Sequence, residues 1–151
     1  MIEGYLQNGT FGYRSSRGYM YDASYISHAH GWSSGPTSAL TNYVLGLSVT
    51  DRAGSKWSLK PQFGDLTSVQ GGFTTILGKF EAGWNVTGGG RGYTLTWSTP
   101  AGTQGSVVLP ALPRGGSGRV KLDGKVMKNK LVKQGGLAMT VAGGSHTVTV
   151  S

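Results

Sequence analysis

Few side chains of this sequence can do acid–base chemistry. The 151 residues hold six Asp and Glu, three His and no Cys. Four of the carboxylates lie in turn-like contexts or in a predicted strand, where solvated structural roles are expected: Asp51, Asp65, Glu81 and Asp123. Glu3 and Asp22 lie instead in an aromatic-rich segment, which favours sugar stacking and altered titration. We therefore expect any catalytic carboxylate within the first 30 residues.

Two other site chemistries have partial signatures in the same region. His28 and His30, with Asp22 nearby, are of the types that bind metals, but this spacing leaves Asp22 unconstrained, so no metal site is expected. Residues 31–35, Gly-Trp-Ser-Ser-Gly, match the G-x-S-x-G nucleophile elbow, with His146 downstream as a base. That elbow follows several parallel strands, whereas only thirty loop-like residues precede it here, which disfavours an esterase.

Composition excludes several further classes of site. The absence of Cys excludes disulfides, thiol catalysis, zinc fingers and iron–sulfur clusters. The glycine runs at 88–92 and 115–118 contain neither a dinucleotide fingerprint nor a Walker sequence. The sequence therefore predicts no cofactor.

The chain is basic, with a formal charge of +8. Seven basic residues share one twenty-residue stretch with a single acid, Asp123: Arg114, Arg119, Lys121, Lys125, Lys128, Lys130 and Lys133. Such clusters bind polyanions, but residues 119–127 alternate polar and apolar types around an Asp-Gly turn, and no aromatic lies among them to stack on bases. We expect a hairpin with a solvated face and no nucleic-acid partner, and binding of an acidic polymer would depend strongly on salt.

The first residues and two sequons bear on location. Residues 23–50 carry no charge but are too polar to cross a bilayer, so no membrane partner is expected, and no signal-peptide pattern follows Met1. Asn8-Gly-Thr and Asn85-Val-Thr are glycosylation acceptors. They predict a secreted protein.

One substantial helix is expected. Pro36 suits a first helical turn after Ser34, and Gly46 is placed to end it. Apolar residues repeat along one face of this segment: Ala39, Leu40, Tyr43, Val44 and Leu47.

From residue 57 onward the pattern becomes β. Seven strands bounded by turn residues are expected at 57–62, 78–86, 93–98, 105–112, 118–122, 125–127 and 146–150. Strands without intervening helices favour antiparallel pairing. The sequence thus predicts a mostly β protein, an antiparallel two-sheet β-sandwich over residues 55–151 preceded by a loop-and-helix segment over residues 1–54.

Seven short segments of this sequence, taken together, resemble one known protein family. They are residues 2–5 (Ile-Glu-Gly-Tyr), 13–19, 27–37 (Ser-His-Ala-His-Gly-Trp-Ser-Ser-Gly-Pro-Thr), 43–46, 61–66, 78–84 and 107–110. The first four resemble the end of the (α/α)6 catalytic barrel of family 78 glycoside hydrolases, the α-L-rhamnosidases. Their sequences are most similar to those of fungal members. The last three resemble the C-terminal β-sandwich of that family. The resemblance runs through nearly the whole chain.

The resemblance implies roles for three residues. Glu3 best fits the position of the general base of these inverting hydrolases, and His30 fits a histidine that contacts the rhamnose ring. Trp32 would be a neighbouring wall residue. The general acid of the family comes from earlier parts of the barrel that this sequence does not contain.

Two expectations follow about what the chain does alone. Since one carboxylate cannot supply both acid and base, we expect the 151 residues not to hydrolyse rhamnosides appreciably, although the parent enzyme would act on a rhamnose-containing glycan. The alternative is a stand-alone secreted module that binds sugar or a host surface, as an effector or elicitor does. Its exposed aromatics would bind a ligand or drive self-association, and they are Tyr5, Tyr13, Tyr19, Tyr21, Tyr25 and Trp32.

Overall fold

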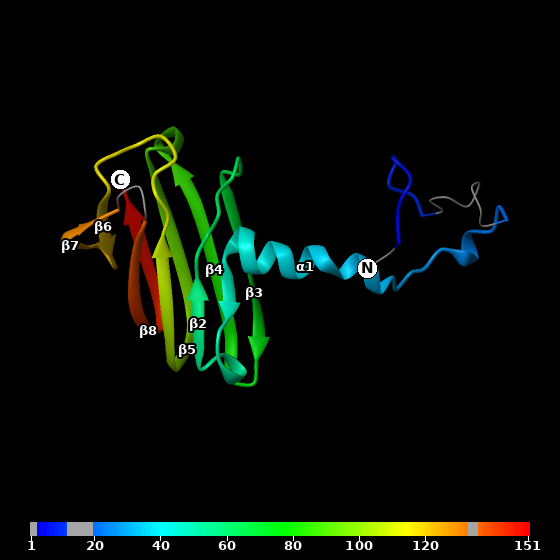
Figure 1. The fold of residues 1–151 in the computed structure, drawn as a ribbon, viewed down its shortest axis with the longest axis horizontal. Helices are drawn as coiled ribbons and strands as arrows, with labels where there is room; N and C mark the ends of the chain where they lie inside the picture. The colour runs from blue at the N-terminus through cyan, green and yellow to red at the C-terminus, as the bar shows by residue number, and fades with distance from the viewer. Residues whose placement is uncertain (1–2, 12–19, 133–135) are drawn as a thin grey trace. The chain divides into compact units, whose positions relative to one another are not determined.

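The structure, a computed structural model, describes residues 3–11, 20–132 and 136–151. It forms two units, Met1–Ala39 and Leu40–Ser151 (Figure 1). The expected boundary near residue 55 stays a prediction, but Leu47 already pairs with Leu59 across two strands of the second unit. No helix in the described ranges is both long and apolar enough to span a membrane.

The elements follow one another in chain order. The first unit contains 3-10 helices η1 (Ala23–Tyr25) and η2 (Gly31–Ser34) and helix α1 (Gly35–Ala39). The second contains π-helix η3 (Leu40–Leu45), strand β1 (Leu47–Val49), 3-10 helix η4 (Arg52–Gly54), β2 (Lys56–Leu59), β3 (Ser68–Thr75), β4 (Gly78–Thr87), 3-10 helix η5 (Gly88–Gly90), β5 (Gly92–Leu109), β6 (Arg119–Leu122), β7 (Lys125–Leu131) and β8 (Leu137–Val150).

The expected helical stretch exists, but its buried face was predicted wrongly. Residues 31–45 are helical as consecutive 3-10, α and π segments, and the π-helix shifts the face that Leu40–Leu45 presents. Leu40 and Tyr43 are exposed, whereas Leu45 is buried. Gly46 ends the helix as predicted, at φ +84°, where a side chain would collide with the Lys60–Pro61 backbone. Leu47 therefore lies in β1 instead of the helix.

The mostly β sandwich is confirmed, with two layers drawn from one continuous eight-stranded sheet. The first half of β5 pairs with β4 and the second half with β2, while β8 runs antiparallel beside both halves. The register shifts between Thr99 and Gln104, where the extra residues bend the strand. Layer A is then β3–β4–β5–β8–β6–β7, and layer B is β1–β2–β5–β8 (Figure 1).

One pairing departs from the antiparallel expectation. Strand β2 runs parallel to the second half of β5, with Trp57 beside Gly105. The chain reaches β3 from β2 through a loop, so β2 is free to pair with a strand that comes much later in the sequence. All other pairs are antiparallel.

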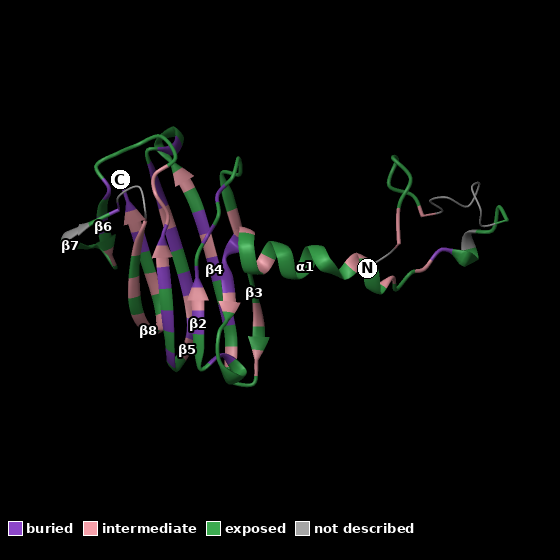
Figure 2. Ribbon diagram, viewed as in Figure 1, coloured by how far each residue is buried: buried purple, intermediate pink, exposed green. Residues whose placement is uncertain are grey.

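The core lies between the two layers. Side chains alternate inward and outward along β4 and β5, as the purple and green bands of Figure 2 show. The indoles of Trp57 and Trp97 face each other across the layers with ring centroids 6.5 Å apart, and Phe63 packs on Trp84 at 4.8 Å. The buried cluster consists of Leu45, Leu47, Trp57, Leu59, Phe63, Phe80, Ala82, Trp84, Tyr93, Leu95, Trp97, Val107, Leu109, Val120, Val132, Val148 and Val150.

The Asp-Gly hairpin of β6 and β7 forms as predicted. Leu122 pairs with Lys125 across a two-residue turn in which Asp123 and Gly124 have φ of 50° and 78°. Its basic side chains with described placement are exposed: Arg119, Lys121, Lys125 and Lys128.

Candidate functional sites

Glu3 and His30, the two polar residues expected at a sugar site, lie together in the first unit. The backbone N–H of Ser27 donates to Glu3 Oε2 at 3.0 Å, and the Glu3 N–H donates to the Ser27 carbonyl at 2.9 Å. His30 Nδ1 lies 3.9 Å from the same carboxylate oxygen. Both side chains keep some access to solvent, 18% for Glu3 and 29% for His30. The carboxylate is thus held in orientation with an imidazole beside it.

The neighbouring aromatic residues are presented to solvent. Trp32, in η2, is 92% exposed, and Tyr21 is 83% exposed. Tyr5 and Tyr25 are exposed as well. Tyr13 and Tyr19 lie outside the described residues. The aromatic segment therefore exposes at least four rings to solvent.

The other candidates of this unit have local structural roles. The ring of His28 packs on Phe11 with centroids 4.1 Å apart. Asp22 Oδ1 accepts the Ser24 N–H at 2.8 Å, and this hydrogen bond lowers the pKa of the Asp22 carboxyl. In the described ranges no three His, Asp or Glu side chains are grouped so as to hold a metal. The G-x-S-x-G string lies in and just after η2, not at the end of a strand.

The two predicted glycosylation sites are both exposed. Asn8 Oδ1 accepts hydrogen bonds from the Thr10 N–H at 3.1 Å and the Thr10 hydroxyl at 2.8 Å. Asn85 lies on β4, opposite Ser68 and Thr94 of the adjacent strands. Exposure leaves both amides accessible to a modifying enzyme.

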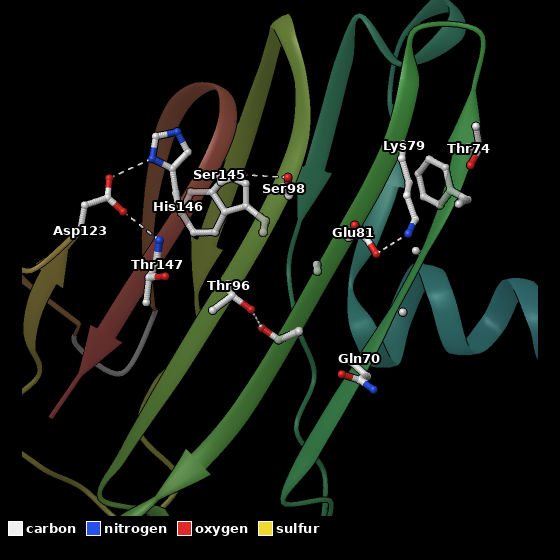
Figure 3. Close-up of a pocket in the computed structure, with 16 residues that line it drawn as sticks. Gln70, Thr74, Lys79, Glu81, Thr96, Ser98, Asp123, Ser145, His146 and Thr147 are labelled. Atoms are coloured by element: carbon white, nitrogen blue, oxygen red, sulfur yellow. Dashed lines mark hydrogen bonds and ion pairs between the residues drawn. The ribbon is translucent and has the colours of Figure 1, made fainter.

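A groove that the sequence analysis did not predict crosses the outer face of layer A. It has a volume of about 810 Å³ and runs over β3, β4, β5 and β8 to the β6–β7 turn (Figure 3). We call it the outer groove and define it by the side chains labelled in Figure 3: Gln70, Thr74, Lys79, Glu81, Thr96, Ser98, Asp123, Ser145, His146 and Thr147. Alternating Ser and Thr in β5 and β8 was the only available signal, and it does not show which strands are neighbours.

At one end of the outer groove, Asp123 joins the β6–β7 turn to β8. Its Oδ2 lies 2.9 Å from His146 Nδ1, and its Oδ1 accepts the Thr147 N–H at 2.8 Å. Two hydrogen bonds lower the pKa of the Asp123 carboxyl, and the one from His146 has a larger effect than the one from Thr147. His146, considered above as the base of an esterase, pairs with this aspartate.

Comparison with proteins of known structure finds similar folds. The chain is similar in fold to an α-L-rhamnosidase from Dictyoglumus thermophilum (22% identity over 83% of this chain and 14% of that chain, TM-score 0.72). It is likewise similar to the Streptomyces avermitilis α-L-rhamnosidase complexed with L-rhamnose (23% identity, 97% and 13% of the chains, TM-score 0.64). The native enzyme of Aspergillus terreus matches at 23% identity over 96% and 13% of the chains, with a TM-score of 0.66.

These matches show the fold, and this chain spans about one seventh of the length of those three chains. No curated protein sequence matches it. The family described as the bacterial α-L-rhamnosidase C-terminal domain matches residues 46–123, which cover β1 to β6 and more than half of the chain. The chain therefore belongs to the family of α-L-rhamnosidase C-terminal domains.

Proposed function

We propose that this chain is the C-terminal part of an inverting, fungal-type α-L-rhamnosidase and that its β-sandwich is an accessory, structural domain. The observation that carries the proposal is the family match over residues 46–123. Similarity of fold to α-L-rhamnosidases extends beyond that match to 97% of the chain.

Within the parent enzyme, Glu3 would act as the general base. Inversion requires a base that activates water on one face of the sugar and an acid on the other face. The Ser27 N–H orients the Glu3 carboxylate, and His30 lies close enough to share a bound sugar with it. Trp32 would add an apolar wall. The acid would come from another part of the enzyme, so we propose that the 151 residues are inactive alone.

The isolated chain tests that last point. We expect incubation with an aryl α-L-rhamnoside to release no phenol beyond the uncatalysed rate. Turnover close to that of a complete α-L-rhamnosidase would contradict the proposal, because it would require both catalytic groups within this sequence.

A chimera tests the role of Glu3. The chain would replace its structurally matched segment in the Aspergillus terreus enzyme. We expect Glu3→Gln to reduce kcat at least about 100-fold, as removal of a general base does. Asp65→Asn, the matched neutralisation of an exposed carboxylate, should leave kcat unchanged. Equal activity of the chimera and its Glu3→Gln variant would exclude the role of Glu3.

The exposed aromatic segment favours a second candidate function, that of a secreted surface- or sugar-binding module. Trp32 at 92% exposure and Tyr21 at 83% are exposed aromatic side chains of the kind that such a module, or self-association, requires. Calorimetric titration with neutral sugars and sedimentation at increasing concentration test it. A monomer that binds no sugar would remove this candidate.

Secretion and glycosylation belong to the same proposal. The exposed sequons at Asn8 and Asn85 support them. Protein from its native source should lose mass on treatment with peptide N-glycosidase. An unchanged mass would contradict glycosylation.

A further inference from the structure

The outer groove lies on the sheet face opposite the core, and four strands build it. Register places Gln70 opposite Gly83, Gly83 opposite Thr96, and Thr96 opposite Thr147, so these positions form one row across β3, β4, β5 and β8. A second row joins Glu81, Ser98 and Ser145. At a strand spacing of about 4.8 Å, each full row is about 14 Å long. The groove is therefore long enough for an extended ligand.

One glycine leaves part of the floor of the outer groove open. Gly83 lies within its lining. A side chain at Gly83 would start 3.3 Å from the Val69 carbonyl oxygen and 3.5 Å from Thr96 Oγ1, in the middle of the first row. A larger residue at this position would fill part of the hollow.

The titratable side chains that line the outer groove contact one another in two pairs. Lys79 Nζ lies 2.7 Å from Glu81 Oε1 on β4, and Asp123 contacts His146 at 2.9 Å beside β8. Between these pairs the lining carries only uncharged side chains. An anionic ligand would thus find no unpaired cation among the lining residues, and a cationic ligand would find no unpaired carboxylate.

The uncharged centre retains unused hydrogen-bonding capacity. Ser98 and Ser145 share one hydrogen bond at 2.9 Å, so one of the two hydroxyl protons stays available. Thr96 Oγ1 donates to the Gly83 carbonyl at 3.2 Å and still accepts. Gln70 presents an exposed amide, and Thr147 an exposed hydroxyl. The groove therefore offers both donors and acceptors, which matches a ligand rich in hydroxyl groups.

We propose that the outer groove binds a neutral oligosaccharide lengthwise across β3, β4, β5 and β8. Hydroxyl and amide groups of the lining hydrogen-bond the sugar hydroxyls, and the Lys79–Glu81 and Asp123–His146 pairs leave no unpaired charged group to favour an ionic ligand. Because exposed hydrogen bonds each contribute little net free energy, the affinity should be weak, with Kd of about 1 mM. This inference goes beyond the proposed catalytic role and uses none of its residues.

Amide chemical shifts of the uniformly ¹⁵N-labelled full chain test the proposal. The probes are a neutral rhamnose trisaccharide and maltotriose, each raised to about 10 mM. We expect saturable shifts at Gln70, Thr96, Ser98 and Thr147 with at least one of them. Trigalacturonate, an anionic trisaccharide, should leave these amides unshifted.

Three variants show whether the groove side chains cause the binding. Gly83→Gln places a side chain in the hollow and should weaken binding at least about tenfold, and Thr96→Val should weaken it about fivefold. Thr149→Val is the control, since Thr149 lies on the same face but outside the groove lining. It should change Kd less than twofold, and an unchanged far-UV spectrum would show that each variant is folded.

Several outcomes would overturn the proposal. They are the absence of groove shifts with both neutral probes, shifts confined to the aromatic segment around Trp32, binding of trigalacturonate alone, and equal affinity of folded Gly83→Gln. None of them bears on Glu3, because activity of the chimera is measured separately. Loss of the catalytic proposal would likewise leave the groove titration unaffected.

Discussion

Thr103 shows how a single buried hydroxyl holds the bend of β5 against the core. Its Oγ1 accepts the Trp57 indole N–H at 3.0 Å and donates to the Pro100 carbonyl at 2.7 Å. The side chain is only 6% exposed, so water cannot replace either partner. Thr103 thereby fixes both the bend of β5 and the side chain of Trp57 on the neighbouring strand β2.

Replacing Thr103 by Val should destabilise the protein by about 1–3 kcal/mol, because the Trp57 N–H would be buried without a partner. Urea unfolding followed by tryptophan fluorescence measures the change. Thr103→Ser keeps the hydroxyl and should lose less. Thr149→Val, the same substitution on the outer face, is the control, and equal stability of Thr103→Val and the unchanged protein would refute the role of this hydrogen bond.

The lowered pKa of Asp123 predicts that the unfolding free energy of the protein depends on pH. Its pKa in the folded protein is depressed below the ordinary 3.8 by His146 and the Thr147 N–H, so the charged carboxylate stabilises the fold. This contribution is complete above the unfolded-state pKa and is lost as pH falls through the lower folded-state value. Asn tolerates the positive φ of this position, so Asp123→Asn removes the charge and keeps the turn.

The difference in unfolding free energy between the unchanged protein and Asp123→Asn should be fully present near pH 5 and should shrink as the pH falls below about 4. Effects of Asp22 and Asp51 are common to both proteins and cancel in the difference. A difference that stays constant down to pH 2.5, or widens below about pH 4, would contradict the assigned cause.

At the scale of elements, the parallel pair of β2 and β5 depends on Gly105. A Cβ at this residue would collide with the Trp57 indole, which lies beside it in the register. Glycine is required at this position because the Trp57 ring approaches its backbone closely. A positive φ is not the reason, since Gly105 has none. The two-layer packing and the parallel pairing thus rest on the same contact.

Gly105→Ala should destabilise the second unit by about 1–3 kcal/mol through overpacking. Gly71→Ala is the matched control, because its Cβ would meet only Leu45 Cδ2, at 3.4 Å. Combining Gly105→Ala with Trp57→Leu should cost less than the two single changes together, since the smaller side chain relieves the collision. Additive losses of unfolding free energy would exclude the contact as the cause.

Local patterns predicted some elements and failed for others. The Asp-Gly hairpin and the strand at 78–86 were predicted correctly, because turn type and alternation are local properties. Strand β5 was predicted as two strands, since Pro100 and Gly102 are typical of a turn and only pairing with β8 carries the strand through them. Strand β3 was missed because Gly71 and Gly72 interrupt its alternation, and β1 because Leu47 also fits the helical period.

Sequence analysis bears differently on the two candidate sites, and the roles expected of Glu3 and His30 stay predictions. Glu3 and His30 were predicted through their resemblance to a family, and the structure places them 3.9 Å apart. The outer groove was missed, since its row joins Gln70 to Thr147 across strands that are distant in sequence. Its position follows from register, which single residues do not encode.

At the scale of the whole molecule, the two units hold very different shares of the core. Every member of the buried hydrophobic cluster belongs to Leu40–Ser151, whereas Ile26 is the one buried hydrophobic residue among the described residues of Met1–Ala39. The hydrophobic free energy of folding therefore resides almost entirely in the second unit.

A fragment of residues 40–151 should fold alone, with the β-type far-UV spectrum of the full chain and a urea midpoint within experimental error of it. A fragment of residues 1–39 should be unfolded in isolation, as its size and single buried side chain imply. An unfolded 40–151 fragment would show that the first unit contributes to the stability of the second.

The bend at Thr99–Gln104 has a mechanical consequence. Because β5 and β8 each continue from layer A into layer B, a pull applied to one layer is transmitted along covalent backbone into the other. Neither layer has a boundary at which it can detach without breaking the other's hydrogen-bond ladder. Residues 40–151 should then unfold in one cooperative step under force or heat. An optical-tweezers trace should show a single unfolding transition, with no intermediate in which half of the sandwich is unfolded.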